Sequence, residues 1–444
     1  MTVHVHARQF LIGPEPCRMT PDWVFRSLDH GLVLSSCPRL GLSERPQGLV
    51  LGLAADTEDG DGPPETWAGR WVLIAGRRLQ MDAAGTLGCF HRRTPAGTWV
   101  SSSPEILRLI EPGLPLPSHP LERGRGMSWY PPPASGITGV DRLLPSQMLD
   151  LVSGAVEPRR LLVDDALDGY AEILARLRRR LVAAVRGAAA QRSDLWIALT
   201  GGRDSRVILA AAVSAGVRAT TYTFDDETMA AEDRELPPVL AKAVGFEHRR
   251  IQLLGIDAGL AELFDRHTAG HGVDAPRDQV IRGGWHRLPP SATALGGLCF
   301  EVARCFYHRR LPAVTHGPDA TATAILRALP SGTPDGIRRW AAWAAGSDEP
   351  SLDWRDRFYL EQRLAGWAGS NAQGVDATGR ELVHLASCGA FISDLLRMPL
   401  DLRCSGRHQR DLVASMAPEL AGFPSAPPRR RTRDILGRTT IDRA

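Results

Sequence analysis

The sequence predicts an α/β protein with a β-rich N-terminal part and a later parallel sheet. Three observations predict this class. Residues 1 to about 155 alternate between apolar and polar positions and are broken by turns, as in "GRWVLIAGRRLQMDAAGTLG". Strand and helix patterns then alternate from about residue 170 onward, which indicates parallel strands with crossover helices. After about residue 320 the apolar spacing is mostly helical.

Length and composition are those of an ordinary globular chain. The 444 residues exceed one comfortable hydrophobic core, so we expect two domains. A net charge of +3 disfavours a dedicated nucleic-acid binder. The start, "MTVHVHARQF", lacks the apolar segment of a signal peptide, and no run approaches membrane-spanning length. We therefore expect a cytoplasmic protein with neither a nucleic acid nor a membrane as partner.

The positions of the cysteines, the lysine and the first histidines limit the kinds of site that we expect. The seven cysteines are scattered without a CxxC pair, so neither a zinc site nor a disulfide framework is indicated. Of the 53 lysines and arginines only Lys242 is a lysine, and we expect it on the solvated face of a helix. His4 and His6 alternate in an expected strand, where a solvated face is favoured over a metal site.

The β-rich part contains several readable segments. "GTWVSSSPEIL" predicts a strand that leads into a turn, and "GVDRLLPSQMLDLVSG" predicts a strand, a proline turn and a second strand. "YPPPASG", residues 130–136, is expected to be a proline-stiffened loop.

The later part alternates helices and strands. "GYAEILARLRRRLVAAVRGAAAQ" has apolar residues at helical spacing from Tyr170 to Val185. Leu195–Leu199 predicts a buried strand, and the following apolar run predicts a helix that ends at Gly216. Residues 218–224 predict a second strand. "LPPVLAKAVG" predicts a second helix with proline in its first turn. "PPRRRTRDILGRTT" is expected to be a solvated basic tail.

The loop between the first of these strands and its helix suits an anion. Gly201 and Gly202 allow backbone N–H groups to approach phosphate oxygens, and a helix N-terminus favours negative charge. Thr200 and Ser205 add hydroxyl donors, and the Asp204 carboxylate can hold a divalent metal. No Gly-Lys-Ser/Thr follows, so the loop is not a Walker A motif.

Two other segments are expected at the same sheet edge. One is the end of the next strand, residues 224–226. The other is "TALGGLCFEVARCFY", residues 293–307, where Gly296 and Gly297 follow a short apolar run. Ligands of a doubly wound sheet bind beyond the carboxyl ends of its strands, so the three segments predict one site.

The loop "LTGGRDS" resembles the "SGGxDS" pyrophosphate loop of the adenine-nucleotide α-hydrolase (PP-loop) superfamily, specifically of the asparagine synthetase-like family. "AEDRELPPVLAKAVGFEHRRI" and "LGGLCFEVAR" are similar to later elements of that family, and "WVSSSPEIL" and "GITGVDRLLPSQMLDLVSG" to its glutaminase domain. The resemblance covers nearly the whole chain. It implies a degenerate Ntn-hydrolase-like, glutamine amidotransferase-type domain at residues 1–160. A doubly wound PP-loop synthetase domain with a helical C-terminus would follow at 165–425, and a basic tail at 426–444.

The resemblance also implies ATP and Mg²⁺ as ligands. Asp204 and Glu301 would hold the metal, and Glu301 stands where the family has an aspartate. The ATP and pyrophosphate contacts would come from Leu199, Thr200, Gly201, Gly202, Asp204, Ser205, Thr223, Phe224, Gly296 and Gly297.

The N-terminus departs from the family. A glutaminase of this type needs a cysteine as its first residue after methionine removal, whereas this chain begins Met1, Thr2, Val3 and has its first cysteine at Cys17. Thr2 could act as an N-terminal nucleophile, but a structural remnant is favoured. Ammonia from glutamine is then not the nitrogen source. β-Lactam synthetases and lasso-peptide cyclases, which resemble the same family, also lack that cysteine.

A second departure is the missing late lysine, which in the family neutralises charge on the leaving group. Arg407 or Arg410, in "FISDLLRMPLDLRCSGRHQRDLVASMAPEL", is the candidate replacement. An arginine offers a permanent charge but no proton at neutral pH.

The catalytic base has two candidates in "DRFYLEQRLAGW", namely Tyr359 and Glu361, because some family members use a Tyr–Glu pair. A plain amphipathic helix is the alternative. Glu232 and Asp233 are expected to cap the second helix rather than approach the metal. His267 and His271, in "HTAGHGVD", are expected to be loop histidines near the cleft.

Together these features predict an ATP-dependent carboxylate–amine ligase that releases pyrophosphate and AMP and forms an amide, lactam or macrolactam, as in natural-product and antibiotic biosynthesis. Its substrate would be a small molecule or a peptide, and a homodimer or partner proteins of a biosynthetic pathway are compatible with it. A lasso-peptide macrolactam cyclase, an RNA-modifying enzyme and a catalytically degenerate nucleotide-binding homologue remain alternatives.

Overall fold

The computed structural model describes residues 4–58, 62–115, 127–163, 169–225, 229–253, 258–268, 283–331, 333–347, 349, 351–425, 431–433 and 439–441. Thr2, Asp226 and His271 lie outside the described residues.

The β-rich part forms two six-stranded antiparallel sheets. In spatial order the first contains β10 (Asp141–Arg142), β8 (Phe90–Thr94), β9 (Gly97–Ser101), β1 (Phe10–Gly13), β3 (Val33–Ser36) and β2 (Val24–Ser27). The second contains β12 (Val156–Pro158), β11 (Gln147–Asp150), β7 (Arg78–Met81), β6 (Trp67–Ala75), β5 (Gly48–Asp56) and β4 (Leu42–Arg45). Apolar side chains of both sheets, among them Phe10, Leu34, Leu51 and Val72, form one cluster, so the sheets pack face to face.

Most readable segments of this part fold as expected, but the segment "GTWVSSSPEIL" leads from β9 into a helix rather than into a turn. The "GRWVLIAGRRLQM" segment is the β6–β7 hairpin, and β10 and β11 flank the proline turn. Ser103 caps α1 (Pro104–Ile110), because its side chain accepts a hydrogen bond from the backbone N–H of Glu105. The segment 130–136 contains no helix or strand.

The later part contains a five-stranded parallel sheet, which confirms the alternation of strands and helices. Its spatial order is β15 (His248–Gln252), β14 (Thr220–Asp225), β13 (Leu195–Ala198), β16 (Thr293–Gly296) and β17 (Glu381–His384). The helices before β17 are α2 (Tyr170–Gln191), α3 (Arg203–Ala215), α4 (Ala231–Ala243), α5 (Ala258–Thr268), α7 (Phe300–Ala303), α8 (Pro318–Ala328), α9 (Pro334–Ala345), α10 (Trp354–Phe358), the π-helix η4 (Tyr359–Ala368) and α11 (Gly369–Asp376). After β17 come α12 (Gly389–Arg397), α13 (Leu400–Ser405) and α14 (Arg407–Met416).

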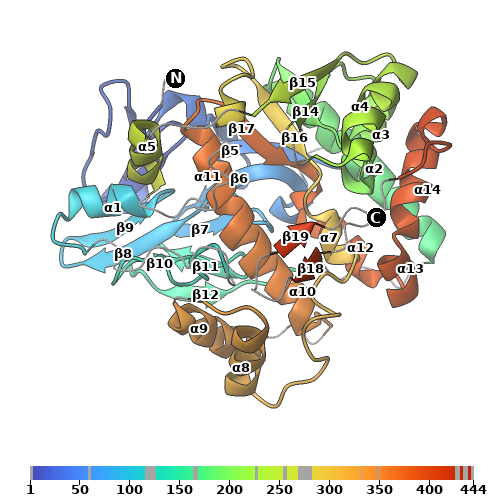
Figure 1. The fold of residues 1–444 in the computed structure, drawn as a ribbon. Coiled ribbons are helices and arrows are strands. Elements are labelled where there is room, and N and C mark those ends of the chain that lie inside the picture. Colours follow the sequence, from blue (N-terminus) through green and yellow to red (C-terminus); the bar gives the residue numbers. More distant parts are fainter. Residues whose placement is uncertain are drawn as a thin grey trace.

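The two halves share a core. Leu53 and Ala68 of the second antiparallel sheet, Leu177 and Leu181 of α2, and Ile197 of β13 belong to one buried cluster. α2 therefore lies between that sheet and the parallel sheet, where Figure 1 shows it beside α3. The opposite face of the parallel sheet is covered by a second cluster, which contains Trp196, Tyr222, Trp285, Leu288 and Val375. Burial on both faces explains the apolar character of the central strand β13, whereas the edge strand β15, with the sequence HRRIQ, is mostly exposed.

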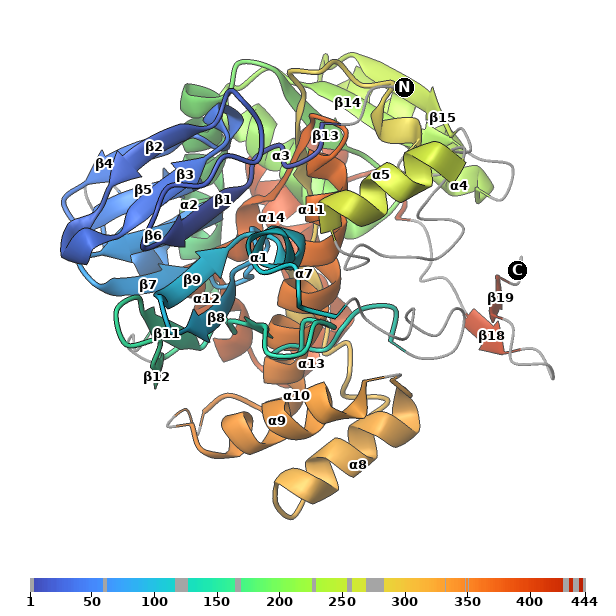
Figure 2. The ribbon, with the colours of Figure 1, turned by 90° about the vertical axis from the view of Figure 1, so that its left-hand side faces the viewer.

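Helices α8 and α9 form a pair at one end of the molecule, and Figure 2 shows them apart from the sheets. Among the described helices, none combines the length and apolar character that crossing a bilayer requires.

The expected strand at His4 and His6 was wrong. Residues 5–8 form a turn, and β1 begins only at Phe10. His6 has a positive φ of 61° and is buried rather than solvated, and its backbone N–H donates to Nδ1 of His267 over 2.8 Å. Alternation over a few residues could not reveal this turn, because a distant helix provides the histidine that stabilises it.

One further expectation needs correction, and two others need detail added. α4 begins at Ala231, so Pro237 and Pro238 lie inside the helix rather than in its first turn. β17 forms within the segment that was expected to be mostly helical, because its short apolar run pairs with β16. The basic tail contains an antiparallel pair of short strands, β18 (Arg431–Arg433) and β19 (Thr439–Ile441).

Candidate nucleotide and metal site

The order of the parallel strands reverses between β13 and β16. The chain runs outward from β13 to β14 and β15, and then returns to the other side of β13 to form β16 and β17. Ligands of open α/β sheets bind beyond the carboxyl ends of the strands at such a reversal. Two of the predicted segments, the loop Thr200–Ser205 and the pair Gly296 and Gly297, follow the two strands that border it.

The loop after β13 is tight and leads directly into α3. The backbone N–H of Thr200 donates to Oγ of Ser205 over 3.1 Å, and that of Gly202 donates to Oγ1 of Thr200 over 3.2 Å. No side chain caps α3, whose N-cap residue is Gly202. The first amides of an uncapped helix lack intrahelical partners and attract an anion. Leu199 remains part of the sheet, because its N–H donates to the carbonyl of Tyr222 over 2.8 Å.

The second strand end requires glycine. A Cβ atom on Gly296 would lie 2.4 Å from Cε1 of His384, and one on Gly297 would lie 2.9 Å from the carbonyl carbon of Asp204. Both distances are shorter than side chains tolerate. Gly297 therefore lets the chain after β16 approach the first turn of α3, and Gly296 leaves room for the ring of His384 on β17. Burial lowers the pKa of His384 to about 4, so this ring is neutral.

One guanidinium joins the two predicted metal ligands. Nη2 of Arg304 lies 2.9 Å from Oδ2 of Asp204 and 2.9 Å from Oε1 of Glu301. The remaining oxygens have donors of their own, since Gln409 donates to Oδ1 of Asp204 and the Tyr359 hydroxyl donates to Oε2 of Glu301 over 2.9 Å. The two carboxylates thus converge on one point, although α3 and α7 carry them.

Burial sets the protonation of this cluster. It raises the pKa of Asp204 to about 7; the charge of Arg304 opposes this rise and that of Glu301 adds to it. Burial, and then the charge of Glu301, raises the pKa of Tyr359 well above its ordinary value. Tyr359 therefore acts here as a hydrogen-bond donor, and taking up a proton from an amine would first require it to lose its own.

The donor set fits a magnesium ion that arrives with a nucleotide. In the described part of the chain, no group of three or more histidine, cysteine, aspartate and glutamate side chains could hold a metal by itself. Magnesium at phosphate sites uses one or two carboxylates together with phosphate oxygens and water. Asp204 and Glu301 supply two carboxylates that one central atom can reach.

The end of the neighbouring strand β14 has a mainly structural role. Oγ1 of Thr223 donates to the carbonyl of Leu199 over 2.6 Å, which fixes β14 against the start of the loop. The ring of Phe224 is half-buried and meets the rings of Tyr222 and Trp285 edge-on at 5.2 and 5.3 Å. Thr223 therefore has its hydroxyl engaged, while Phe224 packs against the cluster that contains Tyr222 and Trp285.

Asp233 does not cap α4, whose N-cap residue is Ala230. Its carboxylate accepts a hydrogen bond from the backbone N–H of Gly201 over 2.9 Å. Asp233 and Glu232 both lie in the first turn of α4. The backbone N–H of Gly201 therefore already donates to a carboxylate at the edge of the loop.

Three catalytic candidates lie apart from this cluster. Glu361 is fully buried and accepts hydrogen bonds from Ser146, Trp340 and Arg357. Arg407 is exposed and pairs with Asp411 over 3.3 Å.

Arg410 is also exposed, and it donates to the carbonyl of Ser405 over 3.4 Å. Arg203 donates to the same carbonyl over 3.0 Å, so Arg410 lies at the rim of the loop rather than on the carboxylates.

The sequence argument missed Arg304 and Gln409. Arg304 follows Glu301 by three residues on a short helix, a spacing that could have indicated an ion pair. Gln409 lies more than two hundred residues from Asp204, and nothing in its local sequence indicates the contact.

The structure also shows where His267, Lys242 and the cysteines lie. His267 belongs to α5 and is buried against the turn at His6, so it is not a loop residue of the cleft. Lys242 is exposed on α4, as expected. All seven cysteines are free, which confirms that they form no disulfide framework.

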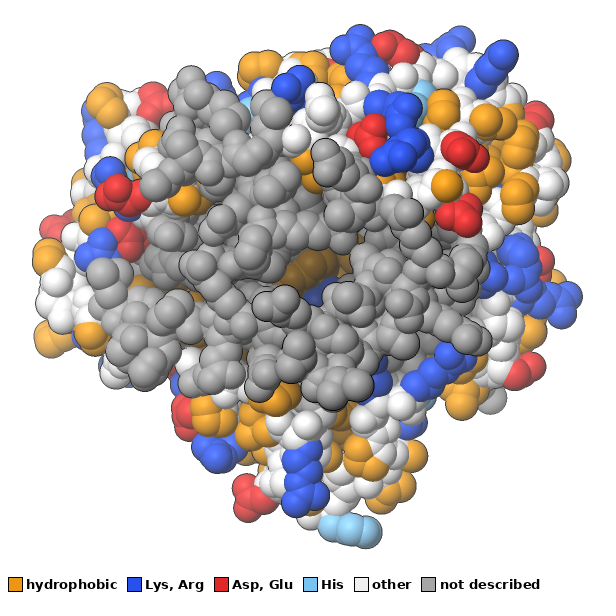
Figure 3. Space-filling view, in the orientation of Figure 1, with side chains coloured by type: hydrophobic (Ala, Val, Ile, Leu, Met, Phe, Trp, Pro, Cys, Tyr) orange, Lys and Arg blue, Asp and Glu red, His pale blue; other side chains and the backbone are white. Residues whose placement is uncertain are grey.

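The face that carries α7 and α11 is hollowed near its middle, where Figure 3 shows hydrophobic and basic side chains at the bottom of the hollow.

Comparison with protein-family models found no match to this chain, and comparison with curated proteins found none either.

Proposed function

We propose that the protein is an ATP-dependent ligase that activates a substrate carboxylate as an acyl-adenylate and joins it to an amine. The single observation that carries this proposal is the convergence of Asp204 and Glu301 on one point beside the uncapped N-terminus of α3. The amides at the N-terminus of a helix attract phosphate groups, and a neighbouring pair of carboxylates can hold a divalent cation. Together they suit a nucleoside triphosphate that binds with such a cation.

The chemistry balances in two steps. A substrate carboxylate oxygen attacks the α-phosphorus, the bond to the bridging oxygen breaks, and pyrophosphate leaves. An amine nitrogen then attacks the activated carbonyl, AMP leaves, and the amine loses a proton. The product is an amide, a lactam or a macrolactam, according to whether the two groups belong to one molecule.

The residues have separate tasks in this proposal. The first amides of α3, which follow the loop, would hold phosphate oxygens, and Asp204 and Glu301 would hold magnesium, which would neutralise charge on the phosphates when bound. Arg304 takes the place of the missing lysine, because it brings a permanent positive charge into the site, whereas Arg407 and Arg410 are exposed. Tyr359 orients Glu301 through its hydroxyl.

A second candidate is a nucleotide-binding homologue without catalytic activity. The position of Arg304 favours it, because its guanidinium nitrogen lies between the two carboxylates, at the place that a metal ion would take. A lasso-peptide macrolactam cyclase is a narrower form of the ligase proposal, in which the carboxylate and the amine belong to one peptide.

The test combines binding with turnover. Calorimetry should detect one equivalent of ATP in the presence of magnesium, and pyrophosphate release should appear with one member of a panel of carboxylic acids and acidic peptides. Asp204→Ala should abolish release, whereas Asp401→Ala, which changes an exposed aspartate of α13, should leave it unchanged. Absence of ATP binding would overturn both candidates. Binding without release by any substrate would favour the inactive homologue.

A further inference from the structure

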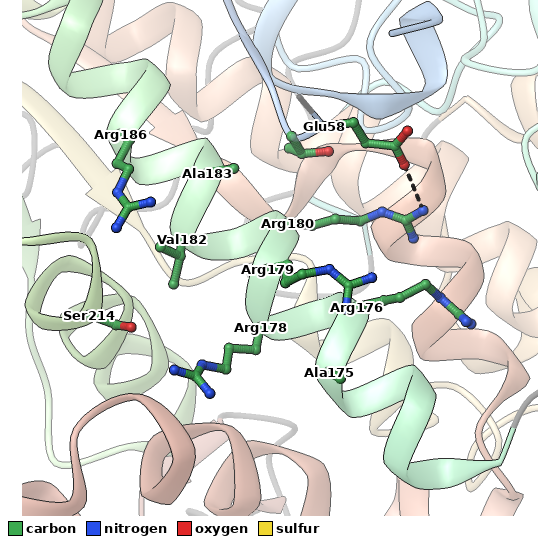
Figure 4. A pocket seen from close by; sticks show the side chains of 11 residues that line it. Glu58, Ala175, Arg176, Arg178, Arg179, Arg180, Val182, Ala183, Arg186 and Ser214 are labelled. Carbon is green, nitrogen blue, oxygen red and sulfur yellow. Dashed lines mark hydrogen bonds and ion pairs between the residues drawn. The ribbon is translucent and has the colours of Figure 1, made fainter. Parts of the chain in front are cut away.

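We infer that a groove along α2 is a docking site for an acidic peptide segment. The groove has a volume of about 870 Å³, and Thr57 and Glu58, which follow β5, form one end of it. Ser214, near the end of α3, lines another part. Figure 4 shows the side chains of α2 extending along it.

Five arginines of α2 line the groove: Arg176, Arg178, Arg179, Arg180 and Arg186. Two of them have acidic partners, since Arg176 pairs with Asp394 over 2.8 Å and Arg180 pairs with Glu58 over 3.1 Å. The other three are exposed, and none of them forms an ion pair with any residue that the structure describes. Among the residues that the structure describes, the groove therefore has an excess of positive charge that no acidic side chain neutralises.

The arginines of this groove differ from those of an ordinary solvated helix face in how closely they are placed. Arg178 and Arg179 are adjacent and lie close to Arg176 and Arg180 on the same helix, so their charges repel one another. Charges of one sign along a concave surface with low-dielectric walls reinforce one another and attract a ligand of opposite sign. An anion in the groove would relieve the repulsion and gain bidentate hydrogen bonds from the guanidinium groups.

The shape and lining favour a peptide. From Arg176 to Arg186 the helix advances about 15 Å, a length that an extended peptide covers with about five residues. Ala175, Val182 and Ala183 add apolar surface between the charges, and no aromatic side chain is found among the described lining residues. Single-stranded nucleic acids usually need aromatic rings to stack their bases.

The groove is separate from the nucleotide loop. The loop lies at the start of α3, whereas Ser214 lies near its end, about 16 Å farther along the helix. Both sites can therefore be filled at once, and the inference does not depend on the proposed function.

The test measures binding of a fluorescein-labelled peptide of alternating glutamate and serine to the full chain by anisotropy. We expect saturable, one-to-one binding that weakens as salt is added. Arg178→Glu with Arg179→Glu should weaken it by at least about tenfold, because two attractive contacts become repulsive. Arg327→Glu with Arg338→Glu makes the same change of net charge on exposed arginines of α8 and α9 and should change it less than about twofold.

Three results would overturn the inference. Equal weakening by both double variants would mean a diffuse charge effect. Tighter binding of a single-stranded oligonucleotide of equal charge, lost in the α2 variant, would make the groove a nucleic-acid site. Competition by inorganic triphosphate at equal concentration would make it a small-anion site. Arg186→Glu, which changes an exposed arginine, provides the same readout if the double variant fails to fold.

Discussion

Two carboxylate clusters of the C-terminal half differ in how their charge is balanced. Glu361 is fully buried and receives hydrogen bonds from the amide and hydroxyl of Ser146, from Trp340 and from Arg357. Asp204 and Glu301 are 21% and 22% exposed and share one nitrogen of Arg304. The first arrangement is complete without a ligand, whereas the second leaves two negative groups with one shared cation. Complete compensation indicates a structural role, and incomplete compensation at an open strand end indicates a binding role.

The largest effect is expected from Glu361→Ala. The change would leave Arg357 buried without its acidic partner and should lower the free energy of unfolding by about 3–5 kcal/mol. Urea unfolding followed by circular dichroism measures this. A loss below about 1 kcal/mol, within the range of an ordinary surface change, would contradict the structural assignment of Glu361.

Asp82 offers a test of buried charge within the N-terminal half. It is fully buried, and burial raises its pKa from 3.8 to about 7. Between these pH values the folded chain keeps a proton that the unfolded chain has lost, so the free energy of unfolding should fall as the pH rises from 4 to 7, by at most about 4 kcal/mol.

Asp82→Asn should flatten that slope, because the amide does not titrate. Asp401→Asn, at an exposed position, is the matched control and should leave the slope unchanged. Identical slopes in the wild type and both variants would show that Asp82 ionises normally in the folded chain.

Arg304→Met tests the shared cation directly. Removing the guanidinium leaves Asp204 and Glu301 facing each other, so binding of Mn²⁺ without nucleotide should strengthen by about tenfold, or about 1.4 kcal/mol, while ATP binding weakens. Electron paramagnetic resonance of free Mn²⁺ and calorimetry measure the two effects. Arg309→Met changes an exposed arginine nearby and should alter neither. Unchanged metal affinity in Arg304→Met would show that the two carboxylates do not form a metal site.

Tyr359→Phe should have a smaller effect. It removes one hydrogen bond to Glu301 and should cost about 1 kcal/mol of stability, with a decrease of about tenfold or less in pyrophosphate release. A much larger loss of release, together with a pH profile displaced from that of the wild type, would instead assign proton transfer to the hydroxyl.

The smallest effects are expected from Arg407→Ala and Arg410→Ala. Both side chains are exposed; Arg407 pairs with Asp411, and Arg410 donates to a backbone carbonyl. Exposed contacts of this kind contribute little, so each change should alter stability by less than about 0.5 kcal/mol. Pyrophosphate release should stay within about twofold of the wild type. A tenfold loss in either variant would restore the sequence-based assignment of that arginine to the leaving group.

Local pattern predicted the elements of the site but not all of its partners. The strand before Thr200, the helix after Gly202 and the glycines after β16 were each readable, because periodicity and glycine reflect local backbone requirements. The contact of Gln409 with Asp204 depends on the packing of α14 against α3, which no local signal encodes. Tertiary contact likewise overrode local preference at His6, where a buried histidine of α5 holds a turn in place of a strand.

The buried cluster that joins Leu53 and Ala68 to Leu177 and Ile197 has a consequence for how the chain can change over time. Deleting the first 160 residues would expose the apolar side of α2 to water. The remaining half would then aggregate rather than fold. A segment that had lost every chemical task would still be inherited intact, since selection for solubility alone would protect it.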